Sequence, residues 1–133
     1  MSPKIDPMMA RYLAVGGGGA VGALLRFGVI ESIGSADPTR FPWHTLVVNL
    51  LGSLVIGFFF RYWRSLSNDR RSDLQRLFFT TGVLGGFTTF STLSLDSVDL
   101  FRHDAWLNGA IYLAVTLLGG LALAAVGYGY RRR

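Results

Sequence analysis

Hydrophobic residues of this 133-residue chain fall into four long runs that are separated by short polar segments. A helix needs about 20 mostly apolar residues to cross a bilayer. The four runs reach that length and predict transmembrane helices over residues 12–33, 41–62, 75–98 and 105–130. The spans and their connections use nearly the whole chain. We therefore expect an all-α membrane protein with one four-helix domain over residues 1–133.

The third run contains a stretch that a helix disfavours, GVLGGFTTFSTLSLD at residues 82–96. Gly85 and Gly86 are followed by β-branched hydroxyl residues, and glycine costs about 1 kcal/mol relative to alanine inside a helix. No charge lies between Leu77 and Leu95. Broken backbone at membrane depth is tolerated only where protein buries it or where it lines a cavity. The pattern predicts that the third helix is broken in mid-membrane, at a site that handles an ion.

Composition argues against several other classes of protein. Half of the residues are hydrophobic and the mean hydropathy is +0.39. The chain has no cysteine, which excludes disulfides and thiolate metal sites. It has no glycine-rich phosphate loop, no HExxH motif, and no convincing nucleophile–base pair. We therefore do not expect an enzyme.

The net charge of +5 comes from basic residues whose uneven distribution indicates how the chain is oriented in the membrane. Four spans place both termini on one side, and that side carries ten of the thirteen basic residues: Lys4, Arg11, Arg61, Arg64, Arg70, Arg71, Arg76 and Arg131–Arg133. Positively charged loops stay in the cytoplasm. A chain with fixed orientation in the cell inner membrane would therefore have both termini cytoplasmic. The same distribution argues against a nucleic-acid partner.

Two spans carry stripes of polar residues at four-residue spacing. Asn49, Ser53 and Gly57 share one face of the second span, and Tyr112 and Thr116 share one face of the fourth. A buried amide is costly unless it finds partners. Asn49 therefore either makes a helix–helix hydrogen bond, worth roughly 0.6–2 kcal/mol, or donates to an ion pathway. The sequence leaves both interpretations open.

Charged residues near the span ends also have two interpretations. Arg26 either snorkels to the interface or has a pairing or functional role, and Glu31 is a loose candidate partner. Asp96 and Asp99 follow the third span, where carboxylates are more typical of a solvated boundary than of a cation site.

The residue types of the interrupted span favour a small ion. Hydroxyl and amide donors and helix N-termini stabilise anions, and the edge of a phenyl ring is positive. Backbone carbonyls freed by a break, here at residues 85–88, instead hold cations. A path lined with neutral donors suits a small, strongly hydrated anion.

Four motifs together resemble the Fluc (CrcB-type) fluoride channels over nearly the whole chain. GGAVGALLR at residues 18–26 matches GGxxGAxxR, and PWHTLVVNLLGS at residues 42–53 matches PWGTxxxNxxGS. GVLGGFTTFSTLSLD matches GxxGGxTTFSTFSxE. Tyr112 and Thr116 match a tyrosine and hydroxyl pair in the family's fourth span.

The resemblance implies an antiparallel dimer of four-helix subunits with two fluoride pores along the interface. It also implies a structural Na⁺ at the dimer centre, held by the backbone carbonyls of Gly85 and Thr88 from each subunit. Arg26 would be a vestibule arginine, and Phe90 and Leu93 occupy the positions of the ring-edge phenylalanines. The residues that it assigns to the fluoride pathway are Arg26, Asn49, Phe90, Ser91, Thr92, Leu93, Asp96, Tyr112 and Thr116.

The chain departs from the family pattern at three positions. His44 replaces a glycine, Leu93 replaces the second phenylalanine, and Asp96 replaces a longer glutamate. An antiparallel homodimer needs the same chain inserted both ways, whereas ten basic residues against three favour one orientation. We therefore also consider pairing with an oppositely oriented homologue.

The leading hypothesis is a channel that exports cytoplasmic fluoride passively and protects the cell from its toxicity. A small multidrug-type proton antiporter is the first alternative, but it needs a carboxylate in the first span, and none lies between Tyr12 and Ile30. A structural subunit of a membrane complex is the second.

Overall fold

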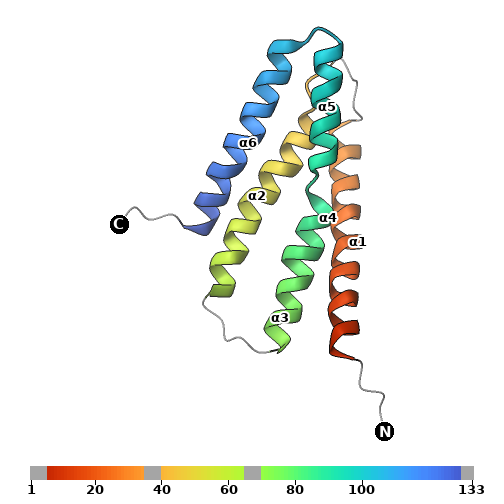
Figure 1. The fold of residues 1–133 in the computed structure, drawn as a ribbon, viewed down its shortest axis with the longest axis vertical. Coiled ribbons are helices and arrows are strands. Elements are labelled where there is room, and N and C mark those ends of the chain that lie inside the picture. The colour runs from red at the N-terminus through yellow and green to blue at the C-terminus, as the bar shows by residue number, and fades with distance from the viewer. Residues whose placement is uncertain (1–5, 35–39, 65–69, 130–133) are drawn as a thin grey trace.

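The computed structural model describes residues 6–34, 40–64 and 70–129, in which all regular structure is helical (Figure 1). Three helices are long and apolar enough to cross a membrane: α1 (Pro7–Ile33), α2 (Trp43–Arg64) and α6 (Trp106–Tyr128). Helix α1 begins before the expected residue 12 because Pro7 occupies its first turn and Asp6 accepts a hydrogen bond from the Met8 N–H at 2.7 Å.

Residues 70–102 form four consecutive helical pieces. These are α3 (Arg70–Arg76), the π-helix η1 (Leu77–Leu84), α4 (Gly85–Phe87) and α5 (Phe90–Arg102). None of them alone has the length of a membrane span. π-Helical turns are rare and occur frequently at functional sites.

The backbone leaves helical geometry at two threonines between α4 and α5. Thr88 has φ −79° and ψ 160°, and Thr89 has φ −150° and ψ 121°. These threonines lie within the stretch 82–96 that the sequence singled out, but they follow the Gly-Gly pair: both glycines are helical, and Gly85 has φ −64° and ψ −36°. Glycine lowers helix stability without dictating another conformation. The extended conformation is instead stabilised at Thr89, which caps α5.

Helix α1 lies along η1 and α4, whereas α2 lies along α6 (Figure 1). Both contacts depend on glycines at the points of closest approach. A Cβ added to Gly82 of η1 would lie 2.8 Å from the Cα of Gly18, and a Cβ on Gly22 would overlap the Val83 carbonyl. Helix backbones approach this closely in lipid only where small residues meet.

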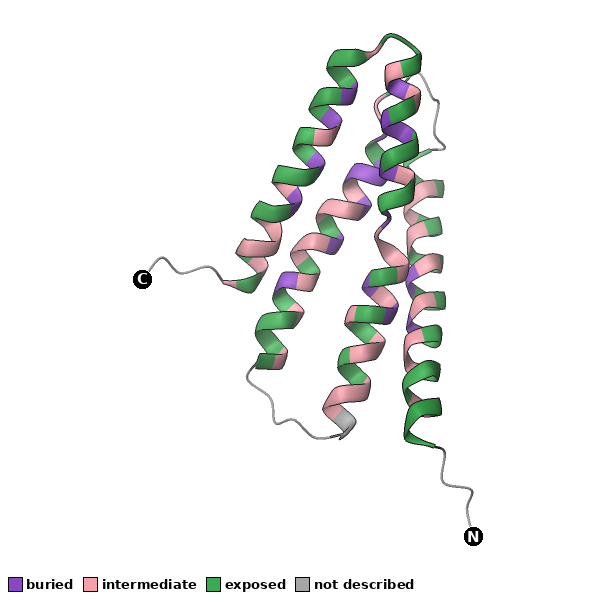
Figure 2. Cartoon of the chain, in the orientation of Figure 1, coloured by how far each residue is buried: buried purple, intermediate pink, exposed green. Residues whose placement is uncertain are grey.

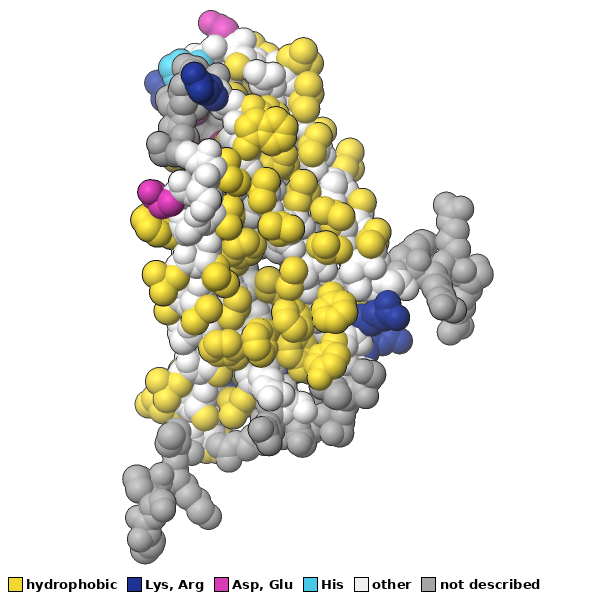
Figure 3. Space-filling model, turned by 180° about the vertical axis from the view of Figure 1, so that it is seen from behind, with side chains coloured by type: hydrophobic (Ala, Val, Ile, Leu, Met, Phe, Trp, Pro, Cys, Tyr) yellow, Lys and Arg dark blue, Asp and Glu magenta, His cyan; other side chains and the backbone are white. Residues whose placement is uncertain are grey.

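The buried side chains gather where α2, α5 and α6 meet (Figure 2). Leu46, Leu93, Leu100 and Tyr112 form this core cluster. Most of the remaining surface carries exposed hydrophobic side chains (Figure 3). A soluble protein rarely exposes so large an apolar area, whereas a protein surrounded by lipid is expected to.

Candidate functional site: the break between α4 and α5

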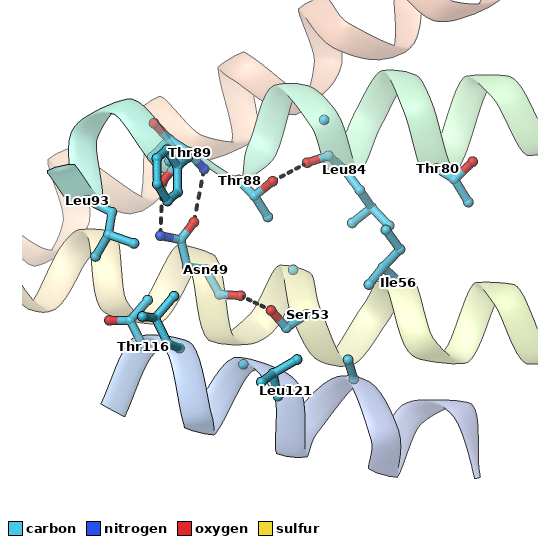
Figure 4. A pocket seen from close by; sticks show the side chains of 16 residues that line it. Asn49, Ser53, Ile56, Thr80, Leu84, Thr88, Thr89, Leu93, Thr116 and Leu121 are labelled. Atoms are coloured by element: carbon cyan, nitrogen blue, oxygen red, sulfur yellow. Dashed lines mark hydrogen bonds between the residues drawn. The ribbon is translucent and has the colours of Figure 1, made fainter. Parts of the chain in front are cut away.

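The side-chain amide of Asn49 on α2 pairs with the backbone of Thr89 (Figure 4). Asn49 Nδ2 donates to the Thr89 carbonyl at 3.0 Å, and the Thr89 N–H donates to Asn49 Oδ1 at 2.9 Å. Both backbone groups of Thr89 therefore have partners although the residue is buried and not helical. Of the two interpretations of Asn49, the helix–helix hydrogen bond is observed. The bond to Thr89 uses one of its two Nδ2 hydrogens.

The hydroxyl groups at the start of α5 form a second hydrogen-bonded cluster. Thr89 Oγ1 accepts from the Thr92 N–H at 3.1 Å and so caps α5. It also lies 3.0 Å from Thr92 Oγ1 and 3.2 Å from Ser91 Oγ. No role was expected for Thr89. Threonine is a favoured N-cap residue, and its position just before the second part of the interrupted span could have revealed it.

A groove with a volume of about 450 Å³ runs along the break and is lined by residues of α2, α6 and the segments from η1 to α5 (Figure 4). Six residues predicted for the site line it: Asn49, Gly85, Thr88, Phe90, Leu93 and Thr116. The others lie outside it.

A second cavity of about 370 Å³ contains Arg26 and Thr92, and Thr89 lines both cavities. The Arg26 guanidinium has no hydrogen bond or ion pair with any residue that the structure describes, so Glu31 is not its partner. Thr45 also lines this cavity, and its buried hydroxyl lies near that of Tyr112 without forming a hydrogen bond of good geometry to a described residue. A guanidinium beside hydroxyl groups is an arrangement suited to an anion.

Asp96 and Tyr112 form a polar pair inside the core. The Tyr112 hydroxyl donates to Asp96 Oδ2 at 3.0 Å. Tyr112 is 0% exposed and Asp96 is 9% exposed. The ring of Phe41 contacts that of Tyr112 edge-on, with centroids 5.6 Å apart. The expectation that Asp96 lies at a solvated boundary is therefore wrong, because α6 packs its tyrosine over the carboxylate.

The two positions that the resemblance assigns to ring-edge phenylalanines differ in their surroundings. Phe90 is 76% exposed, whereas Leu93 is 4% exposed and belongs to the core cluster with Leu46 and Leu100. The substitution of leucine at position 93 therefore fits the packing of this subunit. Phe90 is available to a neighbouring molecule.

Among the described residues, no group of three or more histidine, cysteine or acidic side chains could hold a metal ion. The predicted Na⁺ site would use backbone carbonyls and so would not need such a group.

Comparison with known proteins identifies the family. The family model described as CrcB-like protein, Camphor Resistance (CrcB), matches residues 13–128. A fluoride-specific ion channel FluC of Thermus thermophilus is 43% identical over 120 residues, 90% of this chain and 94% of that protein. The FluC of Hyphomonas neptunium is 40% identical over 125 residues, 94% and 98% of the two chains.

A third relative, the FluC of Rhizobium meliloti, is 41% identical over 119 residues, 89% of this chain and 91% of its own. These similarities extend across all the helices and confirm the resemblance carried by the four motifs. The chain is therefore an integral membrane protein that belongs to the CrcB-like family.

Proposed function

We propose that this protein is a fluoride-selective channel that lets fluoride leave the cytoplasm passively. The observation that carries the proposal is a helix break lined by amide and hydroxyl groups in a chain whose relatives are named fluoride-specific ion channels. Fluoride enters cells as neutral HF, which crosses the bilayer and ionises inside. The membrane potential then drives the anion outward, so that export needs no ATP and no enzymatic step.

The groove supports an assembly of two subunits. It is open along one side of the subunit, and Phe90 at its edge is exposed. A second, antiparallel subunit would cover the groove and complete a pathway that includes Asn49, Phe90 and Thr116. Two such pathways follow from the symmetry of the pair. Five further residues that we propose for the fluoride pathway lie outside the groove: Arg26, Ser91, Thr92, Asp96 and Tyr112. Arg26 and Thr92 line the adjacent cavity.

The backbone at the break supports a structural Na⁺ at the dimer centre. In a continuous helix the Gly85 carbonyl would accept from the Thr89 N–H, and the Thr88 carbonyl from the Thr92 N–H. Here Thr89 donates to Asn49, and Thr92 donates to the Thr89 side chain. The carbonyls of Gly85 and Thr88 thus lose their usual donors, and both residues line the open groove. Unwound carbonyls of this kind coordinate Na⁺ in other membrane proteins.

We further propose that the protein resides in the inner membrane. Its basic residues favour an orientation with both termini cytoplasmic. The partner is then either a second copy inserted the other way or an oppositely oriented homologue. The proton antiporter is not favoured, because α1 carries no carboxylate between Tyr12 and Ile30.

Fluoride efflux from liposomes that contain only the purified protein tests the function, with chloride as the control ion. Rapid fluoride efflux without chloride leakage supports a self-sufficient channel and insertion in both orientations. If the protein alone is inactive, coexpression with a homologue should restore efflux. Inactivity in both preparations would contradict the proposal and favour a structural subunit.

A further inference from the structure

The C-terminal ends of α2 and α6 lie side by side, and two arginines of α2 reach the last residues of α6 (Figure 1). Arg64 Nη1 donates to the Tyr128 hydroxyl, and the guanidinium carbon lies 5.6 Å from the centroid of the Tyr128 ring. Arg61 lies against Gly129, where an added Cβ would be 2.7 Å from Nη1 and 3.2 Å from Cζ. The two guanidinium groups thus converge on adjacent residues of α6.

These two positive charges are not compensated within the described part of the chain. No described carboxylate forms an ion pair with Arg61 or Arg64, although both are exposed. In contrast, Arg11 and Arg76 share Asp73, at 2.9 Å and 3.2 Å. Charges at the same end of the molecule therefore differ: Arg11 and Arg76 share one carboxylate, whereas no described carboxylate pairs with Arg61 or Arg64.

The chemistry of the uncompensated pair suits a phosphate group. A guanidinium has five N–H donors, and Arg64 uses one of them for Tyr128, whereas Arg61 makes no hydrogen bond with a described residue. Arginine donors match phosphate oxygens bidentately. Residues three apart on a helix are neighbours, so Arg61 and Arg64 can contact one headgroup together.

The position of the pair points to a lipid. Both arginines follow the apolar part of α2, and the exposed aromatic residues Tyr62 and Tyr128 lie at the same end of the helices. Aromatic residues of this kind mark the level of the lipid headgroups. On the face shown in Figure 3, basic side chains border the hydrophobic surface. A bound lipid would place its acyl chains along exposed side chains such as Phe58 and Val126.

We propose that Arg61 and Arg64 form a binding site for the headgroup of an anionic phospholipid, which ties the ends of α2 and α6 together. Gly57 and Gly127 bring the two backbones into contact just before this end. The lipid offsets two like charges and links the helices beyond their last close contact. The inference does not depend on which ion the protein conducts.

Native mass spectrometry of the purified protein with phosphatidylglycerol or phosphatidylcholine tests the site. We expect preferential retention of phosphatidylglycerol and, because each basic residue near a surface adds to the attraction, about thirtyfold weaker binding in R61Q/R64Q. The single variant Arg61→Gln leaves the Arg64–Tyr128 contact intact and should show part of the loss if the double variant does not fold.

Arg11→Gln and Arg102→Gln are the matched controls, because Arg11 lies at the same end but is paired with Asp73, and Arg102 lies at the opposite end. Both should retain phosphatidylglycerol as the unaltered protein does. Thermal unfolding in nanodiscs provides a second measurement, in which phosphatidylglycerol should raise the Tm of the unaltered protein more than that of R61Q. Equal losses in all variants would overturn the proposal, as would competition by millimolar inorganic phosphate that removes the lipid effect completely.

Discussion

The chain on the two sides of the Thr88–Thr89 break packs in different ways. Before the break, η1 and α4 lie on α1 through contacts between backbones, at glycines such as Gly18 and Gly82. After the break, α5 lies on α6 through side chains, which include a buried Leu93 and the Asp96–Tyr112 hydrogen bond. The first contact has no room for a side chain, and the second consists of side chains.

The difference explains why a third element is needed at the break. The two pieces have different neighbours, and their helical hydrogen bonds do not continue across Thr89. Asn49 comes from α2 and satisfies both backbone groups of Thr89. Substitutions before the break, after it and at Asn49 should therefore have different effects on stability. The loss of stability should be largest at the backbone contacts and smallest at the exposed ring of Phe90.

The largest effect is expected for Gly22→Ala in α1. Its Cβ would overlap the Val83 carbonyl, and a backbone atom cannot rotate away as a side chain can. Overpacking costs roughly 1–3 kcal/mol, and occasionally more, and this site lies at the upper end. The yield of folded protein in size-exclusion chromatography should fall, and its Tm should be well below that of the unaltered protein.

Gly19→Ala is the control in the same helix, because nothing lies within 4 Å of the added Cβ. Alanine favours a helix by about 1 kcal/mol over glycine, so its Tm should be unchanged or higher. Equal behaviour of the two variants would contradict backbone packing between α1 and η1.

Asn49, which pairs with Thr89 at the break, should be the next most sensitive position. Asn49→Ala removes the partners of both the N–H and the carbonyl of Thr89, and each unsatisfied buried group costs about 1–3 kcal/mol. We expect a loss of about 2 kcal/mol in the free energy of unfolding and a strong decrease in fluoride efflux. Unaltered efflux and Tm would show that the amide is not needed.

Ser53→Ala serves as the comparison for this position. Ser53 lies one turn further on the same stripe of α2, and its hydroxyl donates only to the Asn49 carbonyl at 2.7 Å within the helix. Its free energy of unfolding should be close to that of the unaltered protein.

A smaller effect is expected after the break, for Tyr112→Phe. The variant keeps the ring that Phe41 contacts but removes the hydroxyl that donates to Asp96. We expect a loss of about 1–2 kcal/mol, because the buried carboxylate loses a partner. Adding Asp96→Asn gives a double-mutant cycle in thermal unfolding, and a coupling energy near zero would rule out an energetic role for the pair.

The same contrast shows which features the sequence could predict. Hydropathy and motifs were sufficient for the helices α1, α2 and α6 and for the family. The exact residues of the break could not be read from the sequence, because glycines lower helix stability without fixing where a helix ends. Gly82 and Gly86 instead lie in helical segments that contact α1. Burial of Asp96 could not be predicted, since it depends on how α6 crosses α5, a tertiary contact that no local pattern encodes.

The exposed ring of Phe90 separates function from folding most sharply. Phe90 is 76% exposed in the subunit, so Phe90→Ile should change the free energy of unfolding by less than about 0.5 kcal/mol. If the positive ring edge guides fluoride, a contact worth about 1 kcal/mol is lost, and efflux should fall roughly fivefold. Leu95→Ile, at another exposed position of α5, controls for the introduction of a β-branched residue into this helix and should leave efflux unchanged. A fall in efflux with Leu95→Ile alone would place the pathway on a different face of α5. A fall with Phe90→Ile alone would show that the conducting surface differs from the surfaces that hold the subunit together.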